Sequence, residues 1–158
     1  MTLSFAAILN FSFSASIVVV CGEVLGIYGL MGAGRTEVLE TIFGLHGDEA
    51  QGTLRIAGRE LMPRSPREAM DAGIALIPED RKHDGLVLGM DIARNTTLAS
   101  IGEVLRWGGI DRRKEEAEAD RYRAELAIKS HSCHQPTGEL SGGNQQKVVL
   151  AKMLRTEP

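Results

Sequence analysis

The octapeptide Leu140-Ser141-Gly142-Gly143-Asn144-Gln145-Gln146-Lys147 is the strongest indicator of the fold of this chain. A serine and two adjacent glycines run directly into helix-forming residues, so backbone N–H groups stay unpaired where the helix starts. The helix dipole adds to the positive potential of those groups, and such helix starts bind phosphate. The stretch therefore predicts an anion site at the start of a helix over residues 142–154, with Ser141 as its N-cap.

A second phosphate-binding segment is predicted upstream, at Gly29-Leu30-Met31-Gly32-Ala33-Gly34-Arg35-Thr36. The apolar residues 24–28 before it indicate a buried strand, and residues 37–43 after it indicate a helix that ends at Gly44. This order matches the P-loop G-x-x-x-x-G-K-[ST], in which backbone N–H groups hold phosphates and the Ser/Thr hydroxyl holds Mg²⁺. Thr36 retains that hydroxyl, whereas Arg35 replaces the lysine.

The arginine at position 35 separates this loop from the general P-loop. Arginine is a planar fork and lysine a compact point charge, so a loop shaped for lysine holds phosphate differently with Arg35. We therefore expect this loop to support hydrolysis only weakly. Further along, residues 74–77 predict a short apolar strand, which ends in the charged run Pro78-Glu79-Asp80-Arg81-Lys82.

Three segments of the chain, taken together, resemble a known family. LSGGNQQ at residues 140–146 is similar to the signature motif of ABC ATPases, in the variant found in sugar importers of the ribose and galactose type. GLMGAGRTE at residues 29–37 resembles the second ATP-binding domain of these tandem proteins, where Arg replaces Lys. PEDRK at residues 78–82 resembles the same domain, which carries Glu where most ABC ATPases have Gln.

The resemblance covers residues 22–158 and implies an α/β fold, the P-loop NTPase fold of an ABC-ATPase nucleotide-binding domain, with an incomplete core sheet and a helical subdomain. The cofactors it implies are ATP and Mg²⁺. The residues implied for the ATP phosphates and Mg²⁺ are Gly29, Gly32, Ala33, Gly34, Arg35, Thr36 and Glu79, with Thr36 on the metal through the nucleotide. The residues implied for completing the partner domain's ATP site are Leu140, Ser141, Gly142, Gly143, Asn144 and Gln145.

The resemblance also implies a division of the chain and a set of partners. Residues 22–90 would form the P-loop and switch-loop core, residues 91–140 the helical subdomain, and residues 141–158 the signature helix. The partners would be the first nucleotide-binding domain of the same importer, the transmembrane permease subunits and, indirectly, a periplasmic sugar-binding protein. The location would be peripheral, at the cytoplasmic face of the inner membrane, and the function would be to couple ATP binding and hydrolysis to sugar uptake.

Parts of the family pattern are expected beyond residue 158. The chain stops where the family's next strand would begin, which carries the Walker B aspartate for Mg²⁺ and the catalytic glutamate, followed by a switch histidine. Phosphoryl transfer needs the metal held and the nucleophile positioned. We therefore expect a truncated nucleotide-binding domain that has no catalytic residue of its own, does not hydrolyse ATP alone and has an incomplete parallel sheet.

The composition excludes some classes of function. The 158 residues include 43% hydrophobic and 25% charged residues, which is ordinary for a globular domain. A net charge of −3 and only 4% aromatic residues argue against a nucleic-acid partner. The two cysteines suggest no disulfide framework and a reducing compartment. His131, Cys133 and His134 allow a metal site, but without a second ligand pair a polar loop is the simpler interpretation.

The remaining segments predict ordinary local structure. Residues 1–22 carry no charged side chain, yet they lack the basic start of a signal peptide, and the alternation at residues 11–14 favours a strand. Residues 52–58 also predict a strand. Ser65, Pro66 and Glu68 predict a capped helix that stops at Gly73. Further helices are expected at residues 91–98 and 111–128, the second largely solvated and with a thin apolar side. Its apolar positions are predicted to be Ala117, Tyr122, Leu126 and Ile128, and its i,i+4 ion pairs Arg112/Glu116 and Lys114/Glu118.

Two other functions remain as alternatives. An independent P-loop kinase would explain residues 29–36 but leave LSGGNQQ unexplained. A non-catalytic module that binds a nucleotide or a transporter subunit would explain both motifs without turnover. A dinucleotide-binding loop is excluded, because Glu37 stands where its third glycine would be.

Overall fold

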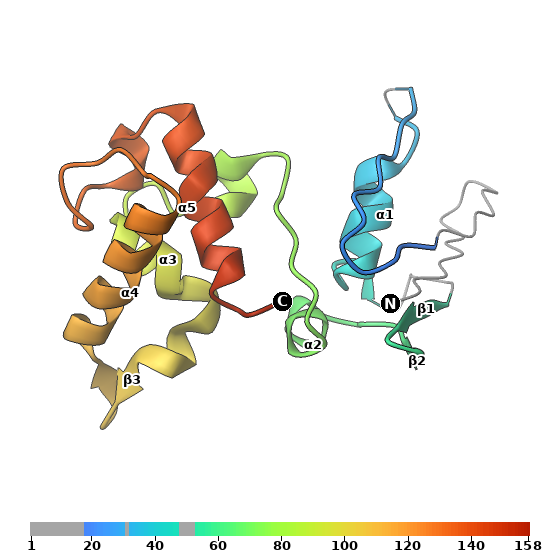
Figure 1. Ribbon diagram of the computed structural model, residues 1–158, viewed down its shortest axis with the longest axis horizontal. Helices are drawn as coiled ribbons and strands as arrows, with labels where there is room; N and C mark the ends of the chain where they lie inside the picture. Colours follow the sequence, from blue (N-terminus) through green and yellow to red (C-terminus); the bar gives the residue numbers. More distant parts are fainter. Residues whose placement is uncertain (1–17, 31, 48–52) are drawn as a thin grey trace. The chain divides into compact units, whose positions relative to one another are not determined.

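The computed structural model describes residues 18–30, 32–47 and 53–158. The chain divides into two compact units, residues 1–76 and residues 77–158, whose elements are labelled in Figure 1. Across the described ranges, every helix is too short or too polar to cross a bilayer. The strand predicted at residues 11–14 lies outside the described residues.

In its described residues, the first unit has two helices and one β-hairpin. Its elements are α1 (Arg35–Ile42), β1 (Leu54–Ile56), β2 (Arg59–Leu61) and α2 (Pro66–Asp71). Leu54 is fully buried, and Val38 and Ile42 of α1 pack against it together with Ile56, Met62 and Ile74. The strand predicted at residues 52–58 is confirmed as β1, and the helix predicted at residues 37–43 is confirmed as α1, two residues longer at its start.

The hairpin turn follows from the residues at its tip. β1 pairs with β2 so that Ile56 lies opposite Arg59, which leaves a two-residue loop, Ala57-Gly58. Both loop residues have positive φ angles, 49° and 79°. This is the geometry of a type I′ turn, whose twist matches that of the flanking strands.

Helix α2 begins and ends where the sequence predicts. The Ser65 hydroxyl accepts a hydrogen bond from the Glu68 backbone N–H at 3.3 Å, and Pro66 occupies the first turn. The Glu68 carboxylate accepts from Arg64 N at 2.9 Å, one residue earlier than in the usual capping box. At the other end Gly73 has a φ of 80°, and Ile74 N donates to Ala69 O at 2.9 Å, which closes a Schellman motif.

The second unit is mainly helical and positions the signature helix. Its elements are η2 (Arg81–Gly85), α3 (Ile92–Thr97), η3 (Leu98–Val104), β3 (Leu105–Arg106), β4 (Gly109–Ile110), α4 (Arg112–Glu125), η4 (Thr137–Glu139) and α5 (Gly142–Leu154). Helix α3 packs against both α4 and α5, as Figure 1 shows. The main core consists of Leu86, Ile92, Ile128, Leu140, Val148 and Val149. The helices predicted at residues 91–98, 111–128 and 142–154 are confirmed as α3, α4 and α5.

A buried asparagine ties the loop at residues 86–91 to α3 and η4. Asn95 accepts from Val87 N at 2.9 Å and donates to the backbone oxygens of Val87, Met90 and Asp91 at 3.0 to 3.2 Å. Since both ends of its amide are used, the side chain satisfies polar backbone groups that α3 alone leaves unpaired. Asn95 Nδ2 also donates to Thr137 Oγ1 of η4 at 3.3 Å, so this one side chain joins the loop, α3 and η4.

The buried face of α4 differs from the predicted one. Glu115, Ala119 and Tyr122 are buried, whereas Ala117 is exposed, so the prediction for Ala117 was wrong. Residues 115, 119 and 122 share one helical face at i, i+4 and i+7, and Ala117 lies off that face. The predicted burial of Tyr122 and Ile128 is confirmed, and Leu126 packs at the core margin.

The ion pairs of α4 also differ from the predicted i,i+4 pairs. Arg112 pairs with Glu115 at 3.2 Å. The Glu115 carboxylate is held in place because it accepts a hydrogen bond from Thr97 Oγ1 of α3 at 3.1 Å. Lys114 donates to the Glu103 backbone oxygen at 2.7 Å, and Glu118 pairs with Arg121 at 2.7 Å.

Two predicted strands of the parallel sheet are not present. Residues 24–28 and residues 74–77 have no strand geometry, and Val24 and Tyr28 are 97% and 94% exposed. A buried parallel strand depends on strands hydrogen-bonded along its edges. Among the residues that the structure describes, the only ladders are the two antiparallel hairpins β1–β2 and β3–β4, so neither segment has a neighbour to pair with.

Candidate functional site

The loop before α1 has the backbone of a phosphate cradle. Gly32 and Gly34 have φ angles of 78° and 76°, and Ala33 N donates to Leu30 O at 3.0 Å. Gly34 occupies the N-cap position of α1 without a side-chain cap, so the first N–H groups of the helix stay available to an anion. Only glycine adopts these positive φ angles without strain, and space is open where a Cβ would stand at either position.

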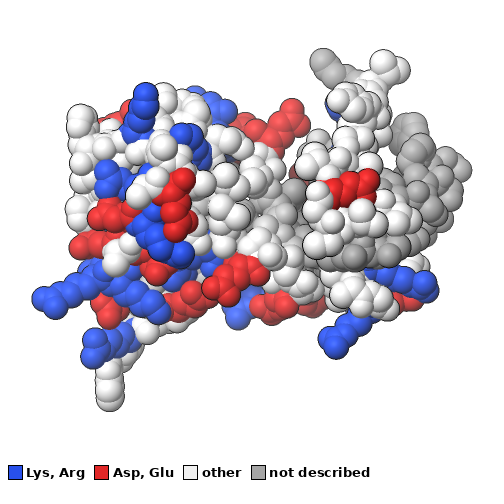
Figure 2. Space-filling view, in the orientation of Figure 1, with Lys and Arg blue, Asp and Glu red and all other residues white. Residues whose placement is uncertain are grey.

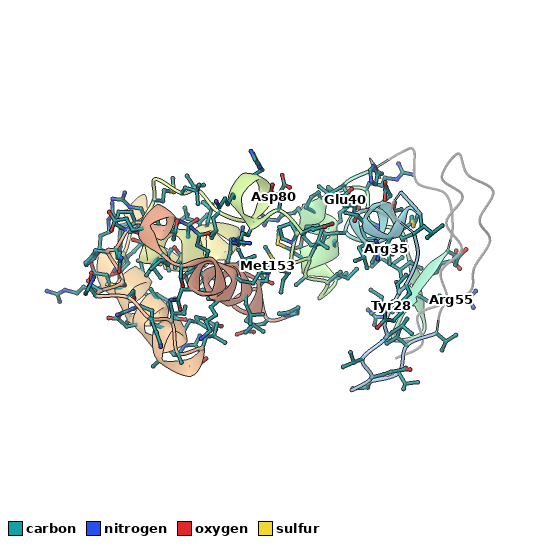
Figure 3. All side chains as sticks on the ribbon, turned by 90° about the horizontal axis from the view of Figure 1, so that it is seen from above. Tyr28, Arg35, Glu40, Arg55, Asp80 and Met153 are labelled. Atoms are coloured by element: carbon teal, nitrogen blue, oxygen red, sulfur yellow. The ribbon has the colours of Figure 1, made fainter. Side chains whose placement is uncertain are left out.

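Arg35 and Gly29 fit together within this loop. A Cβ at Gly29 would lie 2.9 Å from Ala33 Cβ and 3.6 Å from Arg35 Cδ, so a glycine lets the loop fold back on the arginine stem. Arg35 and Thr36 lie in the first turn of α1, and both are exposed. Figure 3 labels Arg35 on this helix and Tyr28 in the extended segment before the loop. An exposed guanidinium at a helix start is suited to bind phosphate oxygens.

The predicted switch residue stands beside a tight acid–histidine turn. Glu79 is exposed and directly precedes Asp80, which is labelled in Figure 3. The Asp80 carboxylate accepts from Lys82 N at 2.8 Å and from His83 N at 3.2 Å, and its second oxygen lies 2.8 Å from His83 Nδ1. The His83 hydrogen bond and these backbone donors lower the pKa of Asp80 to about 2, and the same carboxylate raises the pKa of His83.

The signature residues divide into buried and exposed positions. Leu140 is buried in the main core and anchors the motif, whereas Ser141 and Gly143 are exposed. Ser141 occupies the N-cap position of α5 with a φ of −60°, but its side chain does not cap the helix. The position predicted for Ser141 is therefore confirmed, and its hydroxyl is left for another contact. No atom lies within 4 Å of a Cβ placed at Gly143.

Asn144 holds the Ser141 hydroxyl. Asn144 Nδ2 donates to Ser141 Oγ at 3.0 Å, and Asn144 Oδ1 accepts from Lys129 N at 3.0 Å. The backbone donor fixes which end of the amide faces the serine. Because Ser141 Oγ accepts this hydrogen bond, its own hydrogen is directed elsewhere and is available to an anion. A serine donor beside unpaired helix N–H groups is a suitable arrangement for binding phosphate.

Gln145 faces the interior of the unit. It is 4% exposed, donates to Thr137 O at 3.0 Å and accepts from Arg81 Nε at 3.2 Å. A Cβ at Gly142 would lie 2.7 Å from Arg81 Nη2, so the arginine lies against the start of α5. No sequence pattern linked Arg81 to this region, because 64 residues separate it from Gln145.

Further contacts join α5 to the segment that follows Glu79. Lys152 Nζ donates to the Gly85 backbone oxygen, and burial lowers the pKa of the lysine. A Cβ at Gly85 would lie 2.9 Å from Val149 Cγ2. Residues 81–85 and α5 are therefore closely packed against each other.

The cluster His131, Cys133 and His134 is spread over different surroundings. Cys133 is buried against Ala93 and Ala119, and burial raises the pKa of its thiol. His134 is exposed and lies 3.7 Å from Glu116. Within the described ranges, no three His, Cys, Asp or Glu side chains are arranged to hold a metal ion.

The comparison with known families agrees with both glycine-rich segments. The profile of the ABC transporter family matches residues 13–158. This chain belongs to the ABC transporter family. The family establishes the α/β P-loop fold of an ABC-ATPase nucleotide-binding domain, here with an incomplete core sheet, and implies nucleotide binding.

Similar curated proteins are ATP-binding proteins for sugar import. The chain is 50% identical over 137 residues to a ribose import ATP-binding protein of Rhodopirellula baltica, covering 87% of this chain and 27% of that protein. It is 44% identical to a xylose import ATP-binding protein of Geobacillus kaustophilus, with the same coverage of 87% and 27%. It is 51% identical to a putative ribose/galactose/methyl galactoside import ATP-binding protein of Agrobacterium fabrum, covering 84% and 26%. The chain thus spans about a quarter of the length of these relatives.

Proposed function

We propose that this chain is part of the ATP-binding component of a carbohydrate ABC importer, from its second nucleotide-binding domain. The observation that carries the proposal is the signature region, where Asn144 holds an exposed Ser141 hydroxyl beside the unpaired start of α5. The phosphate loop with its two positive-φ glycines adds a second anion cradle. The relatives named for ribose and xylose import support the substrate class.

The roles proposed for single residues follow from the two cradles. Residues 29–36 would hold one ATP, with Arg35 toward phosphate and Thr36 toward Mg²⁺. Glu79 would be the switch residue that senses the bound nucleotide. Ser141 and the N–H of Gly143 would complete the ATP site of the partner domain. Bound Mg²⁺-ATP supplies the phosphoryl group and the charge that these donors recognise. Leu140, Asn144 and Gln145 would act on that site by holding the signature in shape.

The proposal includes the organisation and partners of the longer protein. We assign residues 22–90 to the nucleotide-binding core, residues 91–140 to the helical subdomain and residues 141–158 to the signature helix. The partners would be the first nucleotide-binding domain, the permease subunits and, indirectly, a periplasmic sugar-binding protein. The chain would work peripherally, at the cytoplasmic face of the inner membrane.

The first experiment measures thermal unfolding of this chain with and without Mg²⁺-ATP. A ligand at 100 times its dissociation constant adds about 2.7 kcal/mol to the folded state, which should raise the melting temperature by about 5 °C or more. Arg35→Ala should reduce that rise. Arg59→Ala removes an exposed arginine from β2 in the same unit and should leave it unchanged. An equal rise in all three proteins would contradict the assignment of the loop.

The second experiment concerns the signature in the full-length importer protein. Ser141→Arg should abolish ATP hydrolysis, because the larger cation fills the anion site at the start of α5. Gln146→Arg adds the same charge to an exposed position of the same helix and should leave most of the activity. Near-normal turnover of Ser141→Arg would overturn the role of the signature. Nucleotide binding by the full-length protein without any turnover would favour a non-catalytic module instead.

A further inference from the structure

The tip of the β3–β4 hairpin carries an exposed tryptophan that the fold does not use. Trp107 is 97% exposed, and the flanking Leu105 and Ile110 are 55% and 37% exposed. Arg106 lies opposite Gly109, so Trp107-Gly108 is a two-residue loop. Burial of a tryptophan is a large source of stability, and none of it is realised here. The side chain therefore contributes to something other than the core of this unit.

The backbone at Trp107 is also unfavourable for this residue. Trp107 and Gly108 have φ angles of 50° and 85°, which is the type I′ geometry that favours Asn-Gly. A bulky residue with positive φ is an outlier, and such outliers concentrate at functional sites. The other hairpin has the same turn geometry with the small residue Ala57 at that place. No burial of the Trp107 side chain within the fold offsets the strain of its backbone.

Basic side chains surround the tryptophan. Between Leu105 and Lys114 the chain has four basic residues and one acidic residue, although the whole chain has a net charge of −3. Arg106, Arg112 and Arg113 line an open hollow of about 430 Å³ together with Trp107 and Ile110. Figure 2 shows blue side chains gathered around this hairpin at the lower left.

The acids near this cluster leave much of its charge exposed. Arg106 lies 3.7 Å from Asp111, but its side chain is 71% exposed. Arg112 pairs with Glu115, whose side chain is almost completely buried. Arg113 is exposed at the start of α4. An anion that approaches the hairpin from solvent therefore meets at least two accessible guanidinium groups.

We propose that the β3–β4 hairpin docks on an anionic phospholipid surface. Tryptophan is favoured at the depth of the lipid headgroups, where its ring is in an apolar layer and its N–H meets polar groups. Arginine binds phosphate oxygens through paired N–H donors, and basic residues at an anionic leaflet each add to binding. The hairpin and the start of α4 bring both kinds of side chain to one hollow. This assignment does not depend on nucleotide binding.

The test uses the intact chain, in which Trp107 is the only tryptophan. Its fluorescence is measured with vesicles of phosphatidylcholine mixed with phosphatidylglycerol and with vesicles of phosphatidylcholine alone. Emission should shift to shorter wavelength only with the mixed vesicles, and lipids brominated on their acyl chains should quench it. Because the signal comes from position 107, attachment through another part of the chain, such as the apolar residues 1–22, does not imitate it.

Two charge variants separate the hairpin from the net charge of the protein. Arg106→Gln with Arg113→Gln should lower the vesicle partition coefficient about 25-fold, at about fivefold for each basic residue. Arg55→Gln with Arg59→Gln removes the same charge from the β1–β2 hairpin and should leave partitioning within about twofold, because the proposed lipid contact does not include those residues. Equal losses in the two double variants would overturn the assignment to β3–β4.

A third variant distinguishes a lipid contact from a structural role. Trp107→Asn supplies the residue that a type I′ turn prefers, so the melting temperature should stay the same or rise while sedimentation with mixed vesicles is lost. A fall in melting temperature with unchanged sedimentation would mean that Trp107 serves the fold. No spectral shift of the native chain with mixed vesicles would overturn the proposal.

Discussion

Gly44 and Gly58 have the same φ angle of 79°, yet their surroundings differ. A Cβ at Gly44 would lie 2.7 Å from the backbone of Ser65, whereas no atom lies within 4 Å of a Cβ at Gly58. The first glycine allows α1 to end against the start of α2, and the second only completes a turn. Gly58 is therefore required by its backbone angle alone, whereas Gly44 is required both by its backbone angle and by its close contact with Ser65.

We predict that Gly44→Ala destabilises the first unit much more than Gly58→Ala. Both substitutions add the strain of a left-handed backbone, about 1–2 kcal/mol, but only Gly44→Ala also forces a side chain into fixed backbone atoms. Its total cost should be about 2–5 kcal/mol, since overpacking adds about 1–3 kcal/mol to the strain. Urea unfolding followed by circular dichroism measures both costs. Equal losses of stability would show that α1 and α2 can move apart freely.

The Asp80–His83 pair should make the stability of the chain depend on pH. The lowered pKa of Asp80 contributes stability above its ordinary value of 3.8, and this is lost as pH falls toward 2. The raised pKa of His83 contributes fully below its ordinary value of 6.5 and is lost as pH rises through the raised pKa. Both contributions are therefore present between about pH 4 and about pH 6.5.

An NMR titration of the His83 imidazole tests this pair. Asp80→Asn should lower the pKa of His83, because it removes both the hydrogen bond and the main opposite charge. Asp84→Asn is the matched control and should lower that pKa less, since Asp84 acts only through its charge. A larger effect of Asp84→Asn would contradict the contact between Asp80 and Nδ1.

At the scale of elements, polar side chains fix the loops that lead into α5. Asn95 joins the loop at residues 86–91 to α3, and Thr137 N and Gly138 N donate to the oxygens of Met90 and Leu88 at 3.0 Å. Arg81 and Lys152 bind the π-helical turn η2 to α5. The geometry at the start of α5 is thus set by contacts between segments that are distant in sequence.

We predict that Asn95→Ala costs about 3 kcal/mol of unfolding free energy. The substitution leaves Val87 N and three part-buried carbonyl oxygens without the side chain that bonds them, at about 1–3 kcal/mol for such losses. Asn144→Ala is the control, because the Asn144 amide lies nearer the surface and makes only two hydrogen bonds. The cost of this substitution should stay near 1 kcal/mol. Chemical denaturation measures both. A cost below 1 kcal/mol for Asn95→Ala would mean that water replaces the network.

At the scale of the whole molecule, each compact unit has its own hydrophobic cluster. Leu54 is the buried centre of the first unit, and Ile92 belongs to the main cluster of the second. Both side chains are fully buried. Stability in this chain is therefore expected to be local to each unit, as in proteins whose parts open separately.

Hydrogen exchange should show this local stability directly. Leu54→Ala should reduce amide protection in α1 and β1, and Ile92→Ala should reduce it in α3 and α5, each by about 2–5 kcal/mol. Mass spectrometry of peptides from the two units reads both effects in one experiment. Loss of protection throughout the chain in either variant would show that the two units unfold together.

The comparison of sequence with structure separates short-range from long-range effects. The helices α2, α3, α4 and α5 were predictable because caps, stop glycines and helical periodicity act over a few residues. The strands predicted at residues 24–28 and 74–77 are absent from the structure, since a parallel strand depends on neighbours far along the chain. Ala117 was misplaced because a helix of mostly charged residues has a weak apolar pattern.

Family membership and both glycine-rich cradles are encoded locally, because positive-φ glycines and unpaired helix N–H groups follow from adjacent residues. Tertiary packing alone decided that Leu140 and Gln145 face inward, that Asn144 holds Ser141, and that Arg81 lies against Gly142. It also decided that Trp107 is left in solvent at a strained turn. These features depend on contacts between side chains that are distant in sequence. Such contacts form only in the folded unit, where buried polar groups must find hydrogen-bond partners.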